Sequence, residues 1–206
     1  MLTFDEPMHT YRWNGEVVPS VTQILREWIK IDIGRGWYVS TFTGAVIDAE
    51  RFEAAGAMGT AIHDMIHAYL EDDLDEENTA PEPLKVLDQF KEWQKAFRPE
   101  IELAEAMMYS EKYGVAGTCD LIAMIGRHKF IIDYKSGAYS TAGPQLSAYE
   151  KLYQEFIGYR SPLKRAVLHL PKDGGKFKWE PQTDRNDFTF FQARLYQYNY
   201  LKRSGK

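Results

Sequence analysis

The stretch FIIDYKSG, residues 130–137, decides the fold of this chain. Its apolar residues run without a break into Asp133, and Ser136-Gly137 ends it, which is the pattern of a buried strand that stops at a turn. Asp133 and Lys135 are two positions apart, so their side chains project from the same face of the strand. The preceding strand explains why a buried strand would end in two charged residues on one face.

That preceding strand is VAGTCDLIAMI, residues 115–125, and Gly126-Arg127 joins the two as a hairpin turn of the Gly-X type. With this turn Asp120 faces Asp133 across the hairpin, on the face that also carries Lys135. At about 4 Å two like charges repel by about 1 kcal/mol in water and roughly 4 kcal/mol near a protein surface.

A divalent cation between the two carboxylates would offset this repulsion, and oxygen ligands suit magnesium or manganese. The alternative is a solvated cluster in which Lys135 alone balances the acids. The register is inferred from the turn, and a shift by one residue would move Asp120 to the other face of the sheet.

The other segments predict an α/β fold with a mixed central sheet and helices on both faces. We expect one domain over residues 1–206, with an N-terminal hairpin and helix start in residues 1–25 and a sheet core in residues 101–170. Further strands are expected at 101–110 and 164–170, with FKWEP (177–181) pairing with the latter, and helices at 59–71, 84–97, 144–156 and 186–202.

The N-terminal part is more varied. HTYRWNGEVVPSV, residues 9–21, predicts a hairpin that turns at Asn14-Gly15. Ser20 is expected to cap a following helix, with Gln23 three residues on as in a capping box. Residues 37–55 are expected to be helical in part, and residues 71–83 to form an acidic exposed loop.

Composition narrows the class of protein. The formal net charge is -5, so a polyanion would have to meet a local basic patch or a bound cation. A single cysteine, Cys119, excludes a disulfide framework and a four-cysteine zinc or iron–sulfur site, and it fits a reducing cytoplasm. We expect no signal peptide, because MLTFDEPMHTYRW lacks an apolar core. We expect no membrane span, because the sequence has no apolar run long enough to cross a bilayer.

Four motifs together resemble the PD-(D/E)xK nuclease superfamily. Gly117–Asp120 followed by Asp133-Tyr134-Lys135 looks like its core motif. In the same way Gly59-Thr60-Ala61-Ile62-His63 resembles the helical histidine motif of the RecB-like exonuclease branch, and Gln145–Tyr149 its Q-x-x-x-Y helix. The opening Tyr11…Gly15…Pro19-Ser20-Val21-Thr22 is similar to the start of many phage-encoded members.

The resemblance implies a restriction-endonuclease-like core and a site with assigned roles. Asp120, Asp133, the backbone carbonyl of Tyr134 and His63 would ligate Mg²⁺ or Mn²⁺. Lys135 would hold or deprotonate the attacking water, with Asp120 and Asp133 completing the catalytic set. No iron–sulfur cluster is expected, because the cysteines of that subgroup are missing, and no nucleotide cofactor, because there is no ATP-binding motif.

The function implied is a metal-dependent deoxyribonuclease that hydrolyses phosphodiester bonds. An exonuclease is favoured, because the histidine helix and Q-x-x-x-Y go with end-processing relatives. Its partners would then be linear DNA, with single-stranded ends as one option, and a recombination or replication protein. Its location would be the cytoplasm, or the host cytoplasm if a phage encodes it.

Some residues and functions remain open alternatives. Glu105, Gln145 and Tyr149 are supporting candidates, each with a plain structural alternative as a solvent-facing or packing residue. A basic stretch that could follow a phosphate backbone consists of Lys164, Arg165, Lys172 and Lys176.

The alternative functions are a catalytically inactive nuclease-like DNA-binding module and a structure-specific endonuclease. His63 and His67 also have the spacing of a zinc peptidase helix, but Asp64 stands where that mechanism needs Glu.

Overall fold

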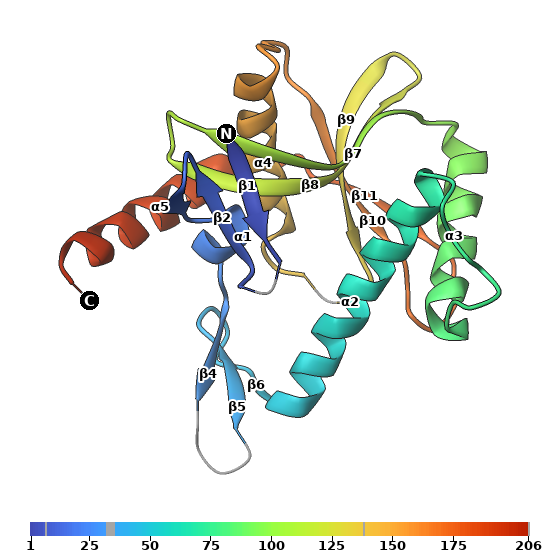
Figure 1. Cartoon of the computed structure of the whole chain (residues 1–206), viewed down its shortest axis with the longest axis horizontal. Coiled ribbons are helices and arrows are strands. Elements are labelled where there is room, and N and C mark those ends of the chain that lie inside the picture. The colour runs from blue at the N-terminus through green and yellow to red at the C-terminus, as the bar shows by residue number, and fades with distance from the viewer. Residues whose placement is uncertain (7, 32–35, 138, 206) are drawn as a thin grey trace.

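A five-stranded sheet forms the centre of the computed structural model, which describes residues 1–6, 8–31, 36–137 and 139–205. The strand order is β11-β10-β9-β8-β7 (Figure 1). β7, β8 and β9 are antiparallel neighbours, β10 runs parallel to β9, and β11 closes the edge antiparallel to β10. The sheet is therefore mixed, as predicted. The strands are β7 Glu100–Ser110, β8 Val115–Ile125, β9 His128–Lys135, β10 Lys164–His169 and β11 Lys178–Pro181.

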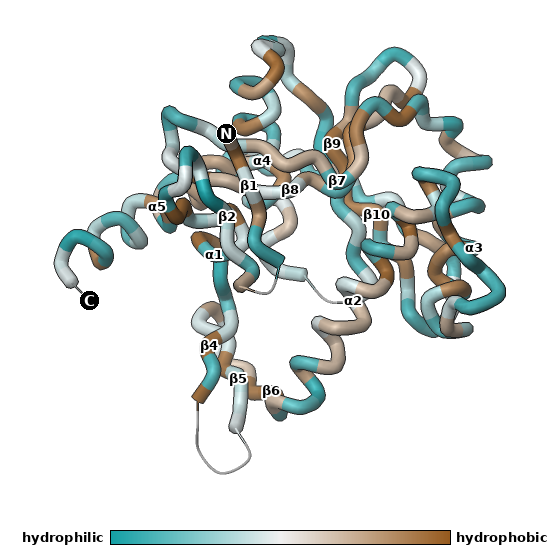
Figure 2. The backbone as a smooth tube through the Cα atoms, in the orientation of Figure 1, coloured by the Kyte–Doolittle hydropathy of each residue, from teal (hydrophilic) through white to brown (hydrophobic). Residues whose placement is uncertain are grey.

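Helices cover both faces of this sheet, which confirms the predicted architecture (Figure 1). On one face α4 (Ala142–Phe156) and α5 (Asp187–Arg203) pack on Ile122, Ile131 and Val167. On the other face the C-terminal half of α2 (Ala49–Leu70) and α3 (Pro81–Phe97) pack on the alternate residues of the same strands. Figure 2 shows the hydrophobic backbone segments concentrated where these layers meet.

The apolar spacing of α3 explains its place. Val86, Leu87, Phe90 and Trp93 recur at helical intervals and are almost completely buried, each contributing roughly 1.5–3 kcal/mol of hydrophobic free energy. The helix ends at Arg98, whose φ of 48° is left-handed, before a proline that cannot continue the helix. It begins at Pro81, so the exposed acidic loop is shorter than the predicted 71–83.

The N-terminal segment forms a second, three-stranded sheet of β1 (Leu2–Asp5), β2 (Thr10–Trp13) and β3 (Glu16–Val18). The predicted turn is present, with φ of 50° at Asn14 and 86° at Gly15, as a type I′ turn requires. Ser20 caps the short helix α1 (Val21–Ile24) by accepting a hydrogen bond of 3.0 Å from the Gln23 amide. The predicted hairpin and cap are confirmed, while β1 was not predicted.

The prediction that residues 37–55 are helical in part is confirmed by α2, but the strands that precede this helix were not predicted. A third sheet is built from β4 (Trp28–Ile31), β5 (Trp37–Ser40) and β6 (Val46–Asp48), and α2 begins only at Ala49. Aromatic and β-branched residues favour strands, but strands this short show no clear period in the sequence. Helix α2 is also longer than the predicted 59–71, and Figure 1 shows its first half and the third sheet projecting from the core.

None of the helices in the described part of the chain combines the length and the apolar character that crossing a membrane requires.

Candidate active site

The two acids that the hairpin was expected to oppose lie at the ends of β8 and β9. The register runs from Ile125 opposite His128 to Leu121 opposite Ile132, as predicted, and Asp120 and Asp133 follow one step beyond the last pair. At this point a side chain replaces a backbone carbonyl as the hydrogen-bond acceptor between the strands: Asp120 Oδ2 accepts a hydrogen bond of 2.7 Å from the Tyr134 amide. Both acids are buried, with exposed fractions of 6% and 1%.

Asp133 is held by two neighbours. Lys135 Nζ lies 2.7 Å from its Oδ2, and Gln145 Nε2 of α4 donates to its Oδ1 at 3.0 Å. Gln145 also donates to the Tyr149 hydroxyl at 3.4 Å, so the two supporting candidates from α4 orient Asp133. Burial raises the pKa of Asp133 to about 6, although the Lys135 ammonium acts in the opposite direction.

His63 reaches the same place from α2. Ile62 and Ile66 of this helix are buried against the sheet, which fixes the side of α2 from which His63 projects. Its Nδ1 lies 3.6 Å from Asp120 Oδ1 and 3.5 Å from Glu105 Oε1. Burial lowers the pKa of His63, but these two carboxylates outweigh burial and raise it to about 9.

Glu105 has an unusual backbone for a strand residue. Its φ is 45°, a left-handed value that costs a residue other than glycine roughly 1–2 kcal/mol. It lies in β7 between the pairs Ala104–Leu121 and Ala106–Cys119, so it sits across from Asp120. Strain of this kind concentrates at functional sites, because the surrounding structure must hold it.

The donor set fits a divalent cation. One ligand atom each from His63, Glu105 and Asp120 lies within 4.8 Å of the other two, and Glu105 Oε1 is buried without a hydrogen-bond partner among the described residues. Two carboxylates and an imidazole suit Mg²⁺ or Mn²⁺. Glu105, which the sequence analysis named only as a supporting candidate, thus belongs to this set of possible metal ligands. Asp133 instead contacts Lys135 and Gln145.

With this geometry in place, comparison with known families is informative. The sequence model of the PD-(D/E)XK nuclease superfamily matches residues 34–202. The chain belongs to this superfamily. No curated protein sequence matches it.

The match begins before α2 and ends within α5, so it includes His63, Glu105, Asp120, Asp133 and Lys135 of the candidate site. Members of the superfamily use divalent metals, in agreement with the acidic cluster. His67, the second histidine of the peptidase-like spacing, does not belong to the metal-ligand group found among the described residues, whose histidine is His63.

The four basic residues that were predicted to follow a phosphate backbone lie in different environments. The Arg165 guanidinium is paired with Asp187 at 2.9 Å and donates to the Asp184 carbonyl at 2.9 Å, which fastens α5 to β10, and its predicted contact with DNA is untested. Lys172 Nζ donates to the Ala55 carbonyl of α2 at 3.2 Å. Lys164 and Lys176 are exposed. Binding of DNA by these three lysines stays a prediction.

The sequence analysis missed residues that surround Lys135. A pocket of about 380 Å³ beside it is lined by Arg26, Trp28, Phe52 and Tyr139, among others. They come from three separate segments, and no motif marks them. The one available signal was the basic and aromatic run Arg26-Glu27-Trp28, which has the residue types of a nucleic-acid contact.

Gly117 of the core motif allows a prediction about packing at the site. A Cβ at this position would lie 2.6 Å from Cε1 of Tyr149, whose ring is buried. Gly117→Ala should therefore lower the free energy of unfolding by about 1–3 kcal/mol, the usual cost of overpacking. Thermal melting would measure it.

Gly56→Ala in α2 is the matched control, since a Cβ there meets nothing within 4 Å and alanine favours a helix. Equal melting temperatures for Gly117→Ala and the wild type would show that Tyr149 does not pack as described.

Proposed function

We propose that this superfamily member is a metal-dependent deoxyribonuclease of the RecB-like, phage-type branch, acting as an exonuclease. One observation carries the proposal: Asp120, Asp133 with Lys135, His63 and Glu105 converge from three strands and a helix. The wide separation of these residues in the sequence makes a chance ion-pair cluster a poor explanation.

The roles of the side chains follow from their contacts. His63, Glu105 and Asp120 would hold the cation, with Asp133 and the Tyr134 carbonyl completing its surroundings. When bound, it would polarise the phosphodiester and make the attacking water more acidic. Asp133 fixes the position of Lys135 Nζ, which lines the pocket. As an ammonium it can hold the water by donating a hydrogen bond, and only as the neutral amine could it take up the proton of the water.

Lys135 would also stabilise the negative charge that develops on the phosphate. It is half-buried, with 25% of its side chain exposed, and water is partly excluded around it, so its charge acts more strongly than it would in bulk solvent. Gln145 and Tyr149 act through Asp133 and are positioning residues rather than catalytic ones.

Two alternative functions are an inactive DNA-binding module and a structure-specific endonuclease. An inactive DNA-binding module is disfavoured, because Asp120, Asp133 and Lys135 are all present and close together. A structure-specific endonuclease has the same site, and the preference for an exonuclease rests on His63 and on Gln145–Tyr149. A recombination or replication protein as partner stays a prediction.

The proposal predicts cleavage that depends strictly on Mg²⁺ or Mn²⁺, because the carboxylates alone would repel a phosphate. The test incubates the purified protein with end-labelled linear and circular DNA, single- and double-stranded, with either metal or with EDTA. Loss of label from linear DNA only, and background activity in EDTA, are expected. Cleavage of circles would identify an endonuclease, and full activity in EDTA would refute the metal site.

A further inference from the structure

The pocket beside Lys135 has a catalytic side and an aromatic side. Lys135, Gln145 and residues 139–141 line it from the core of the protein, and Trp28 and Phe52 line it from the projecting β4 and α2. Its volume of about 380 Å³ lies in the range of sites that hold one small ligand, such as a nucleotide.

The two aromatic rings are held in place by a third. Phe52 stacks on Tyr38 of β5, with ring centroids 4.1 Å apart, and contacts Trp28 at 5.5 Å. All three side chains are half-buried, so part of each ring remains open to solvent. Fixed aromatic rings beside a phosphodiester-cleaving site suit the flat face of a nucleic-acid base, and any of the four bases can stack on them.

The walls of this pocket are joined by Glu27. Its carboxylate accepts hydrogen bonds from Ser40 of β5 and from Ser140 in the loop that follows β9. Its backbone carbonyl accepts two more from Thr41. The third sheet is thereby fastened to the loop next to Lys135. Because the bases of a duplex are stacked on one another, only an unpaired strand can place the face of a base on the rings of this pocket.

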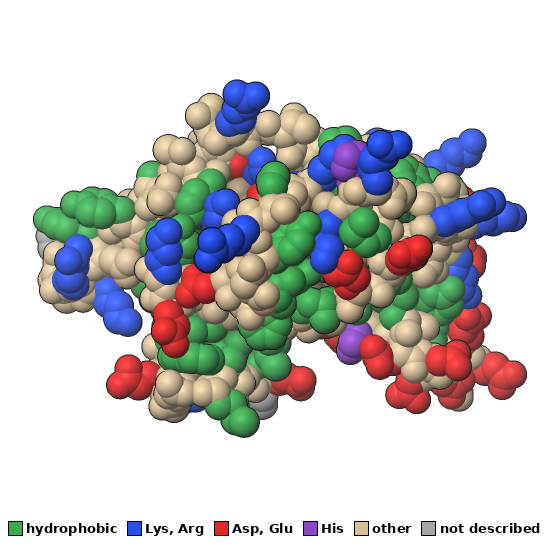
Figure 3. Space-filling model, turned by 90° about the horizontal axis from the view of Figure 1, so that it is seen from above, with side chains coloured by type: hydrophobic (Ala, Val, Ile, Leu, Met, Phe, Trp, Pro, Cys, Tyr) green, Lys and Arg blue, Asp and Glu red, His purple; other side chains and the backbone are tan. Residues whose placement is uncertain are grey.

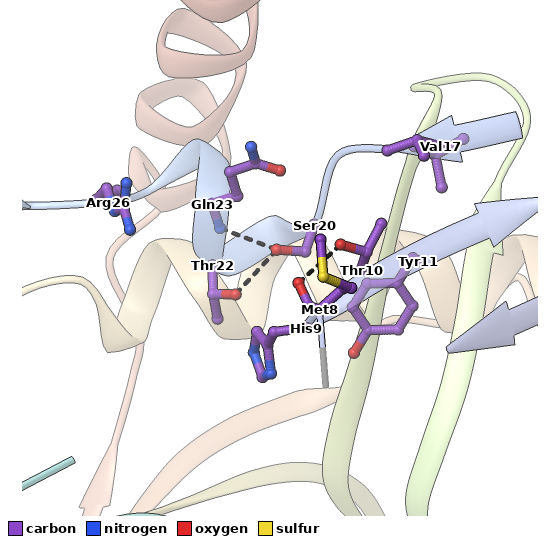
Figure 4. Close-up of a pocket in the computed structure, with 10 residues that line it drawn as sticks. Met8, His9, Thr10, Tyr11, Val17, Ser20, Thr22, Gln23 and Arg26 are labelled. Carbon is purple, nitrogen blue, oxygen red and sulfur yellow. Dashed lines mark hydrogen bonds between the residues drawn. The ribbon is translucent and has the colours of Figure 1, made fainter. Parts of the chain in front are cut away.

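Arg26 connects this pocket with a second one. It lines both, as does Thr22, and its guanidinium makes neither an ion pair nor a hydrogen bond with any residue that the structure describes. The second pocket, about 450 Å³, is lined by polar side chains such as His9 and Ser20 and by apolar ones such as Met8 and Val17 (Figure 4). An unpaired guanidinium between two pockets is the group that proteins use to bind a phosphate.

The charge of the whole chain supports this assignment. The net charge of -5 gives the protein no overall attraction for a polyanion. Figure 3 shows acidic side chains gathered at the lower right of the view, and Lys and Arg side chains spread over the rest of this face. A local cation beside the site would therefore contribute much of the attraction.

We propose that the two pockets form one continuous track for a single unpaired nucleic-acid strand. A base next to the scissile phosphate stacks on Trp28 and Phe52, Arg26 binds a backbone phosphate between the pockets, and the strand continues past Thr22. This inference rests on the proposed nuclease function and specifies its substrate as an unpaired strand.

The test measures binding of a fluorescein-labelled single-stranded oligonucleotide to the full chain in EDTA, at low salt, by fluorescence anisotropy. Phe52→Ala and Trp28→Ala should each raise Kd about tenfold, the usual effect of removing one base stack. Arg26→Gln should raise Kd severalfold and reduce the slope of log Kd against log salt by about 1.

Two matched variants serve as controls. Trp37→Ala removes a 41% exposed tryptophan of the same small sheet, and Arg127→Ala removes an exposed arginine of the β8–β9 turn. Neither residue lines either of the two pockets described above. Both should bind like the wild type. Thermal melting establishes that each variant is folded.

The outcomes separate this inference from the proposed function. If the wild type cuts DNA but the Phe52, Trp28 and Arg26 variants keep its Kd and KM, the strand track is wrong and the nuclease stands. If no metal supports cleavage yet these variants weaken binding, the track stands and the nuclease proposal fails. Equally tight binding of blunt duplex, weakened equally by Phe52→Ala, would overturn the specificity for an unpaired strand.

Discussion

Lys135→Ala is expected to lower kcat by at least about 100-fold, the lower end of what a positioned acid or base contributes. The variant loses the ammonium that lines the pocket and would hold the attacking water. It keeps His63, Glu105 and Asp120, so titration calorimetry should still detect Mg²⁺ binding. A rate near that of the wild type would show that Lys135 does not activate water.

Two further variants make this result specific. Lys135→Ala also leaves the buried Asp133 without its cation, so melting must show that the protein is folded. Lys135→Arg keeps a positive charge but cannot give up a proton, so it should restore stability without restoring the rate. Recovery of the rate in Lys135→Arg would assign Lys135 a purely electrostatic role. Lys95→Ala, at an exposed lysine of α3, should change neither the rate nor the stability.

The parts of the site that could be predicted are those fixed by local rules. A two-residue turn sets the register of its hairpin, so Gly126-Arg127 was enough to place Asp120 near Asp133. Strand alternation then gave the side of Lys135. His63 was assigned to the site by the resemblance of residues 59–63 to the helical histidine motif, not by a local rule.

The parts that could not be predicted depend on tertiary context. The sequence around Glu105 does not indicate that this residue has a left-handed backbone conformation, because glycine or asparagine usually occupies such a position. In the sequence Arg165 resembles a surface cation, but the acids next to it, Asp187 of α5 and Glu150 of α4, are distant along the chain. Likewise, Trp28 and Phe52 meet only because the third sheet folds back on α2.

Asp120→Asn is expected to abolish detectable cleavage and, in the absence of metal, to stabilise the protein. The activity is lost because an amide is a poor replacement for a carboxylate ligand. The shape is kept, since the asparagine oxygen can still accept the hydrogen bond from the Tyr134 amide. The effect on stability therefore reports on charge rather than packing.

The sign of the stability effect follows from the pKa of Asp120. Burial raises it, while His63 and Lys135 act in the opposite direction without cancelling the rise. A carboxyl whose pKa is raised on folding destabilises the folded state above that pKa, and the effect disappears below its ordinary pKa of about 3.9. Near neutral pH the variant should gain on the order of 1 kcal/mol, and near pH 3 it should gain nothing.

Magnesium should reverse the order of the two proteins. A cation at 100 times its Kd adds about 2.7 kcal/mol to the stability of the wild type, and less to a variant that has lost a ligand. Thermal melting of both, with EDTA and with millimolar Mg²⁺, measures this. Asp64→Asn is the control, because it removes the same charge from an exposed position of α2 next to His63. If Asp120→Asn melts below the wild type in EDTA, and Mg²⁺ shifts both equally, then Asp120 shares no cation and its neighbours already balance its charge.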